Sequence, residues 1–101
     1  MHASKDFNLP ISAGYEVRIE YNEDFVILHL PSVSKFTPGV YKDMVCRLYS
    51  FWEFAQTVGY KAVFAAVSPS DKKINRLLDN LGFKFINYGE GEKVYIYTGD
   101  K

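Results

Sequence analysis

The amino-acid sequence predicts an α/β fold of the α+β type with a mixed sheet. The expected order of elements is β-β-α-β-α-β-β. Three observations lead to this prediction. Residues 15–21 alternate apolar and polar side chains, residues 38–58 place apolar side chains at helical spacing, and residues 63–67 form a short apolar run. With 101 residues the chain has room for one domain. We assign that domain to residues 15–101 and expect residues 1–14 to form an extended N-terminal arm.

The composition indicates a neutral, soluble protein. Twelve Lys and Arg residues balance twelve Asp and Glu residues, so no nucleic-acid partner is expected. The apolar run at residues 25–30, which His29 interrupts, is far shorter than the roughly 20 residues of a membrane span, so no membrane association is expected. With one cysteine and two histidines, neither an intrachain disulfide nor a metal site is expected. These features favour the cytoplasm.

The first predicted hairpin joins Tyr15–Tyr21 to Phe25–Leu30. Alternation makes the first strand half-buried, and the second strand is nearly continuous apolar, as in a strand covered on both faces. The polar residues 22–24 supply the turn. Pro31 ends the second strand because proline has no amide N–H to donate.

The longest regular pattern predicts a helix between Thr37 and Gly59. Thr37 is a suitable N-cap, Pro38 fits the first helical position, and Gly59 suits a left-handed stop. The apolar residues of this stretch share one helical face: Tyr41, Met44, Val45, Leu48, Phe51, Trp52, Ala55 and Val58.

The second half of the chain predicts a strand, a helix and a hairpin. Val63–Val67 is expected to be a buried central strand. We expect Ser68 to cap the second helix and Gly82 to end it, with four aliphatic residues on one face: Ile74, Leu77, Leu78 and Leu81. Phe83–Tyr88 and Val94–Thr98 then form a terminal hairpin.

A helical crossover between two buried strands predicts their relative direction. Residues 25–30 and 63–67 are expected to form a central parallel pair, with antiparallel hairpins at both ends of the sheet. In such sheets ligands bind beyond the C-terminal ends of the parallel strands, beside a helix N-terminus. The candidate site therefore lies around residues 31–40 and 67–72.

This arrangement resembles the GNAT superfamily of acyl-CoA N-acyltransferases over residues 15–98, in a reduced form. Residues 70–83 (SDKKINRLLDNLGF) are the most specific part, since they are similar to the family's helix that ends in Leu-Gly-Phe before the last hairpin. The long helix, the strand at residues 63–67 and the terminal hairpin occur in the matching order.

The resemblance implies an acyl-CoA site at the loop and helix start that follow the second strand. In the family, loop amides and the helix dipole hold the CoA pyrophosphate. Carried onto this sequence, the implied CoA contacts are Lys35, Thr37, Gly39 and Val40, with Lys72 near the 3′-phosphate. Acetyl-CoA would then be the cofactor, whereas a non-catalytic domain requires none.

Three departures from the family pattern favour a module without turnover. The loop keeps one glycine and one cation, and Pro38 removes an amide. Leu78 stands where many members have a tyrosine acid, and an aliphatic side chain cannot give a proton. The helical segment that walls the acceptor cleft in the family has no counterpart.

Two groups of residues each allow two interpretations, a functional one and a plain one in which the residue is only structural or solvated. His29 is the candidate base for an ammonium substrate, and its plain interpretation is a packed strand histidine. The basic residues Lys72, Lys73 and Arg76 either bind phosphate or an acidic partner, or form a solvated helix face.

The terminal hairpin is rich in aromatic residues: Phe83, Phe85, Tyr88, Tyr95 and Tyr97. They either pack against the helices or dock a protein partner or a second copy of the chain. The alternating aromatics of residues 93–97 also resemble short GNAT-like proteins of tailed bacteriophages, which implies a phage-encoded protein within the virion.

Two functional hypotheses follow. The first is a GNAT-like domain with a degraded acyl-CoA loop that acts as a non-catalytic binding or structural module. The second is an active acetyl-CoA-dependent N-acetyltransferase that acts on a small amine or a protein amine, with His29 as its base.

Overall fold

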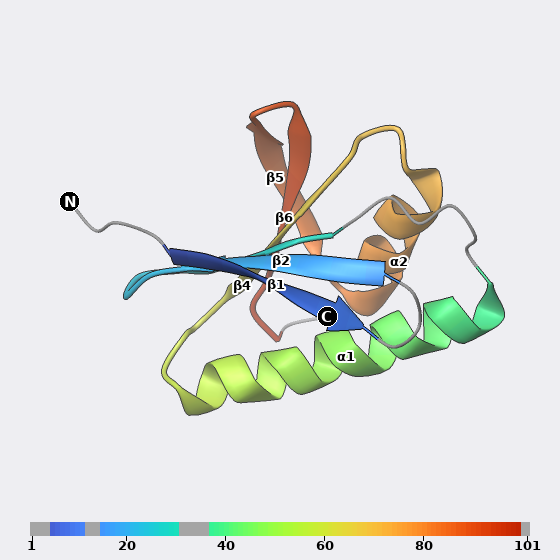
Figure 1. Ribbon diagram of the computed structural model, residues 1–101. Helices are drawn as coiled ribbons and strands as arrows, with labels where there is room; N and C mark the ends of the chain where they lie inside the picture. Colours follow the sequence, from blue (N-terminus) through green and yellow to red (C-terminus); the bar gives the residue numbers. More distant parts are fainter. Residues whose placement is uncertain (1–4, 12–14, 31–36, 100–101) are drawn as a thin grey trace.

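The computed structural model describes residues 5–11, 15–30 and 37–99, which form an α+β fold on one mixed sheet (Figure 1). The strands are β1 (Lys5–Ile11), β2 (Tyr15–Tyr21), β3 (Val26–His29), β4 (Val63–Val67), β5 (Lys84–Gly89) and β6 (Glu92–Tyr97). The helices are α1 (Pro38–Thr57) and α2 (Lys72–Leu81). In space the strands follow the order β1-β2-β3-β4-β6-β5.

The predicted mixed sheet is confirmed. β3 and β4 are parallel, with Ile27 beside Phe64 and His29 beside Ala66. The Leu30 N–H extends this pairing by donating to the Ala66 carbonyl at 3.0 Å. The β2–β3 and β5–β6 hairpins are antiparallel, as expected at the two ends of the predicted order.

The sheet gains an edge strand where an extended arm was expected. β1 pairs antiparallel with β2, from Lys5 beside Tyr21 to Ile11 beside Tyr15. Phe7, Leu9 and Ile11 alternate with Asp6, Asn8 and Pro10, so the sequence carries a strand pattern here, and the proline within it conceals the strand. A proline within it is tolerated because an edge strand leaves one side of its backbone unpaired.

The two helices begin in different ways. The Thr37 hydroxyl accepts the Val40 N–H at 3.1 Å, which confirms the predicted cap of α1. The predicted Ser68 cap of α2 is wrong: the cap is Asp71, whose carboxylate accepts the Ile74 N–H at 3.2 Å. The reason is a turn before the helix, in which the Asp71 N–H donates to the Ser68 carbonyl.

Both helices pack on the same face of the sheet. Tyr97 of β6 meets Trp52 of α1, with ring centroids 5.1 Å apart, and the Tyr95 hydroxyl donates to Asn75 of α2. Tyr95 and Tyr97 are two residues apart in a strand and therefore point to the same side. Figure 1 shows α1 running along this side of the sheet. The core lies between the helices and these strands, with residues such as Leu28, Met44, Ala65, Ile74 and Leu78 buried.

We call the opposite side of the sheet the helix-free face, because no helix of the described residues packs on it. Two rows of paired residues cross it. One row is Arg18, His29, Ala66 and Val94, and the other is Glu20, Ile27, Phe64 and Ile96. Both rows combine charged residues on β2 with apolar residues on β4 and β6.

Asn75 is the one buried polar residue of the described chain, and it joins three segments. Its side-chain amide donates to the Ser68 carbonyl at 3.1 Å and to the Asp71 carbonyl at 2.6 Å. Its side-chain oxygen accepts the Tyr95 hydroxyl at 2.7 Å. One side chain therefore fixes the turn after β4, the start of α2 and the middle of β6.

Substitution of Asn75 tests this junction. We expect Asn75→Ala to lower the free energy of unfolding by about 2 kcal/mol, because buried partners lose their hydrogen bonds. Asn80→Ala, at an exposed position of the same helix, should change it by less than about 0.5 kcal/mol. Urea unfolding measures both values, and equal effects would contradict a special role for Asn75.

Candidate functional site

A pocket of about 510 Å³ opens between the start of α1 and the outer side of α2. We call it the cationic pocket. Its lining residues are Thr37, Pro38, Tyr41 and Lys42 from α1 and its cap, and Lys73 and Arg76 from α2. Lys73 and Arg76 are three residues apart and share one face of α2. The pocket therefore brings three basic side chains to the N-terminal end of a helix.

The surface of the cationic pocket is largely apolar, because Lys42, Lys73 and Arg76 line it mostly with their aliphatic stems, and any attraction for an anion comes from the charged ends of these side chains. Lysine and arginine bind phosphate through charge-assisted hydrogen bonds, and the helix dipole adds positive potential. The first-turn amides contribute less. The Val40 N–H donates to the Thr37 hydroxyl, the Tyr41 N–H donates to the Thr37 carbonyl, and Pro38 has no N–H.

The residues predicted to contact CoA are only partly brought together. Thr37 lines the cationic pocket, and Gly39 lies in the adjacent first turn of α1. The Val40 side chain is buried in the core, and Lys72 is exposed on α2 without lining the pocket. Lys35 lies outside the described residues.

Sequence reasoning did not single out Tyr41 and Lys42 as pocket residues. Tyr41 was expected on the apolar face of the first helix, and it is 37% exposed at the rim of this pocket. The signal for both residues is their position in the first turns of α1, opposite a basic face of α2. Only the tertiary arrangement reveals that these two surfaces meet.

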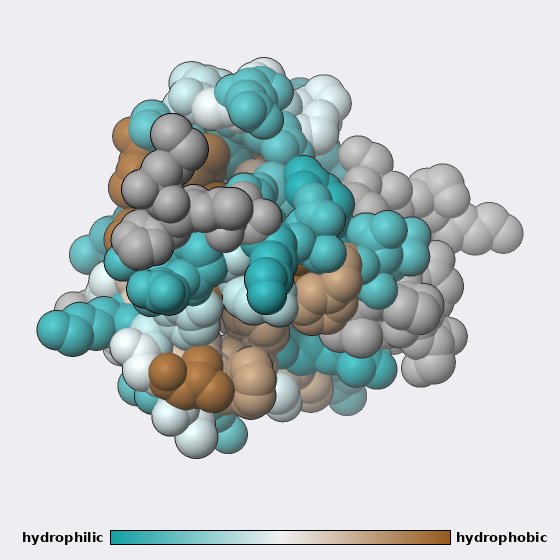
Figure 2. Space-filling view, turned by 60° about the vertical axis from the view of Figure 1, so that its left-hand side comes forward, coloured by the Kyte–Doolittle hydropathy of each residue, from teal (hydrophilic) through white to brown (hydrophobic). Residues whose placement is uncertain are grey.

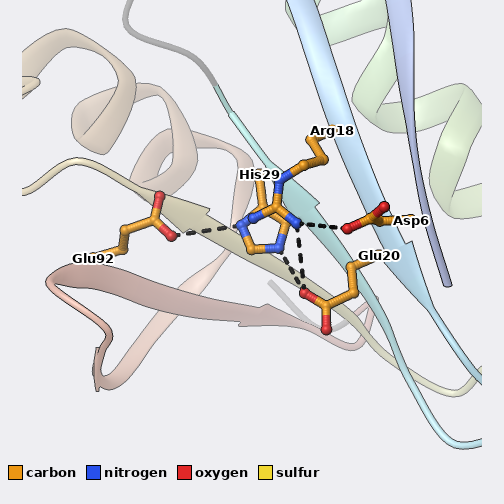
Figure 3. Close-up of polar contacts among 5 residues, drawn as sticks. All are labelled: Asp6, Arg18, Glu20, His29 and Glu92. Carbon is orange, nitrogen blue, oxygen red and sulfur yellow. Dashed lines mark hydrogen bonds and ion pairs between the residues drawn. The ribbon is translucent and has the colours of Figure 1, made fainter. Parts of the chain in front are cut away.

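His29 lies in a polar cluster on the helix-free face (Figure 3). Its Nε2 is 3.0 Å from the Glu20 carboxylate, and its Nδ1 is 3.5 Å from the Glu92 carboxylate. Arg18 extends the cluster, with its guanidinium 3.9 Å from Glu20 and 3.3 Å from Asp6. These charged groups link β1, β2, β3 and β6.

A small residue makes the contact between His29 and Glu92 possible. Ala66 of β4 lies between β3 and β6 in the same row as His29, and it is 3% exposed. Its methyl group leaves room for the His29 ring and the Glu92 side chain to meet above β4. A longer side chain at this position would separate the two.

The environment of His29 favours the plain interpretation over a base. A base needs a nitrogen lone pair that reaches the substrate. The Nδ1 atom is buried and has no hydrogen-bond partner among the described residues, and Nε2 is in contact with Glu20. Leu78, the position at which the stated resemblance would place a tyrosine acid, is wholly buried in the core.

The aromatic residues of the terminal hairpin divide into two groups. Phe83, Tyr95 and Tyr97 are buried under the helices, as the packing interpretation expects. Phe85 and Tyr88, by contrast, are 45% and 66% exposed, although their rings contact each other at 5.2 Å. Helical cover of the sheet therefore does not extend to β5.

The outer strand of this hairpin presents a largely uncharged apolar surface. Ile86 is 46% exposed between Phe85 and Tyr88, and we call these three residues the β5 patch. The Lys93 ammonium of β6 lies 5.0 Å from the Phe85 ring centre. A hydrogen bond with Tyr95 raises the pKa of Lys93 above its ordinary value.

A second apolar surface lies between α1 and the β1–β2 hairpin. It is a groove of about 400 Å³ lined by Phe7, Ile19, Tyr21, Val26, Phe51, Phe54, Ala55, Val58 and Tyr60. Phe54 and Val58 are 60% and 53% exposed at its rim. In the view of Figure 2, hydrophobic surface lies in separate patches among hydrophilic residues.

Two further structural features bear on function. Within residues 5–11, 15–30 and 37–99, no group of His, Cys, Asp and Glu side chains is arranged to hold a metal ion. Neither of the described helices has the length and apolar character needed to cross a membrane.

No model of a known protein family matches this chain, and no curated protein matches its sequence.

The polar cluster on the helix-free face is open to a mutational test. We expect His29→Ala to lower the free energy of unfolding by about 1 kcal/mol, because Glu20 and Glu92 would face each other without the intervening ring. Lys84→Ala, an exposed substitution on the same face, is the control. Denaturant titration at neutral pH measures both, and an unchanged stability of His29→Ala would contradict a structural role.

Proposed function

We propose that this chain is a GNAT-like domain that works as a non-catalytic binding module and docks onto a protein partner through its terminal hairpin. The exposed β5 patch carries this proposal. Aromatic and aliphatic side chains are the usual anchors of protein interfaces, and an exposed strand edge can pair with another chain. Within β5, the large apolar side chains of Phe85, Ile86 and Tyr88 are 45%, 46% and 66% exposed.

The arrangement of the sheet supports the GNAT-like part of the proposal. The resemblance implies a strand followed by a long helix, a second strand parallel to the first, a leucine-rich helix and a terminal hairpin. β3, α1, β4, α2 and the β5–β6 hairpin follow that order, with β3 and β4 parallel. Leu81, Gly82 and Phe83 close α2, and Gly82 adopts the left-handed conformation.

Two side chains support the absence of turnover: His29, the candidate base, and Leu78, at the position expected for an acid. His29 lies between the carboxylates of Glu20 and Glu92, and Leu78 has no proton to give. Both residues have a structural role, since His29 contacts carboxylates on neighbouring strands and Leu78 packs in the core. The resemblance to short bacteriophage proteins fits a structural role, and it makes a virion protein the first class of partner to test.

Site-specific crosslinking tests docking through the β5 patch. We expect the full chain with a photoreactive p-benzoylphenylalanine at Tyr88 to give one discrete covalent adduct in the particles or cells that contain it. The same probe at Tyr49, an exposed aromatic position on α1, is the control and should give none. Adding Phe85→Glu to the Tyr88 probe should abolish the adduct. Equal labelling from both positions would overturn the proposal.

A second function is favoured by the cationic pocket. The alternative is an acyl-CoA-dependent N-acetyltransferase in which the CoA phosphates bind Lys42, Lys73 and Arg76. In such an enzyme catalysis would consist mainly of positioning the amine and the thioester. The three basic side chains at the start of α1 are the observation in its favour.

Acetyl-CoA distinguishes the two functions. With a non-catalytic module we expect no acetyl transfer above background from acetyl-CoA to a panel of small amines and lysine peptides. The second function instead predicts transfer, together with calorimetric CoA binding that Lys73→Glu and Arg76→Glu weaken at least tenfold. Lys61→Glu, an exposed charge reversal before β4, should leave that binding unchanged. Transfer to one acceptor would displace the leading proposal.

A further inference from the structure

We infer that the partner at the β5 patch is a second copy of this chain, joined by antiparallel pairing of β5 with β5 about a twofold axis. This inference rests on the proposed docking function and names its partner. The two sheets would become one continuous sheet, and the β5 patches of both copies would lie side by side at its centre. Four observations on β5 and its neighbours carry the inference.

The first observation is the contrast between the two edges of the sheet. The β1 edge carries Lys5, Asp6 and Pro10, and charges and proline at an edge hinder the addition of another strand. β5 has a charge only at its start, Lys84, and no proline. Its residues from 84 to 88 are exposed, and within the described chain its outer side has no neighbour. Of the two edges, β5 is therefore the one open to pairing.

The second observation is the distribution of charge along β5. Lys84 lies at its beginning, and Glu90 follows directly after its end in the turn to β6. Antiparallel pairing about a twofold axis places the beginning of one β5 against the end of the other. Lys84 of each copy would then lie near Glu90 of the other, whereas parallel pairing would bring the two lysines together. Opposite charges thus favour the antiparallel arrangement.

The third observation is a bulge in β5. Phe85 pairs with Tyr95 and Asn87 pairs with Val94, so Ile86 has no partner on β6. A bulge increases the twist of an edge strand and makes it a poor match for a regular strand. A second β5 carries the same bulge and the same twist. The bulge therefore counts against a regular extended segment as the occupant of this edge.

The fourth observation is the size of the surface that pairing would cover. At about half to two thirds exposure, the Phe85 and Tyr88 rings each offer roughly 100 Å². Ile86 and the backbone of β5 add to this, so the interface belongs to the small class of less than about 1,200 Å² in total. Interfaces of that size are weak. We expect a dimer whose population rises with concentration in the micromolar range.

Charge exchange tests the antiparallel pairing. Sedimentation velocity of the full chain from about 5 to 500 µM should give a rising fraction of dimer. Lys84→Glu should weaken dimerisation about fivefold or more, because each dimer contains the charge pair twice. Adding Glu90→Lys to that variant should restore the affinity of the unaltered chain. Phe54→Lys, which removes an exposed ring from α1, should have no effect on dimerisation.

A disulfide trap provides a measurement independent of these variants. Asn87 lies near the expected twofold axis, so Asn87→Cys in a Cys46→Ala chain should form an intermolecular disulfide under mild oxidation. Cysteine at exposed Lys61 in the same background should not. A chain that stays monomeric at 500 µM and gives no Asn87→Cys disulfide would overturn the inference, as would Glu90→Lys failing to restore the affinity.

The outcomes separate this inference from the function on which it rests. An adduct from Tyr88 to a different protein, with a monomeric chain, would reject the second copy and leave the docking module standing. A monomeric chain with no adduct from Tyr88 would reject both.

Discussion

The parallel pairing of β3 with β4 determines where the other elements can lie. Parallel neighbours cannot be joined by a tight turn, so the chain must cross between their opposite ends, and α1 makes this crossing. β3 is followed by α1 and β4 by α2. Because β3 and β4 are parallel, both helices follow the C-terminal ends of their strands, which lie on the same side of the sheet. The cationic pocket results from this geometry, because the start of α1 and the basic face of α2 meet there.

The two faces of the sheet are stabilised in different ways. One face is covered by both helices and excludes water through aliphatic and aromatic packing around Tyr95 and Tyr97. The other lacks a helix among the described residues, and at its centre His29 lies between the carboxylates of Glu20 and Glu92. Because Nε2 contacts Glu20 and Nδ1 is buried, the ring has little freedom to serve catalysis.

The sequence was sufficient for elements whose signals are local. Thr37, Pro38 and Gly59 bound α1, and the alternation in β2 marks a half-buried strand. β1 carries a similar alternation at Phe7, Leu9 and Ile11, but Pro10 within it is equally typical of an irregular segment. Asp71 replaces Ser68 as the cap of α2 because a turn precedes the helix. The pocket residues Tyr41 and Lys42, and the exposure of Phe85, depend on tertiary cover, which no local pattern reports.

The position of β6 has a consequence for how the chain folds. Of the described strands β6 comes last in sequence, and in space it lies between β4 and β5. β5 therefore leaves the ribosome before β6, the strand that attaches it to the rest of the sheet. Pairing of β6 with β4 must bring together segments that α2 and β5 separate along the chain, and such non-local pairing is slow. Until that pairing forms, the apolar side chains of β5 are open to association with other chains.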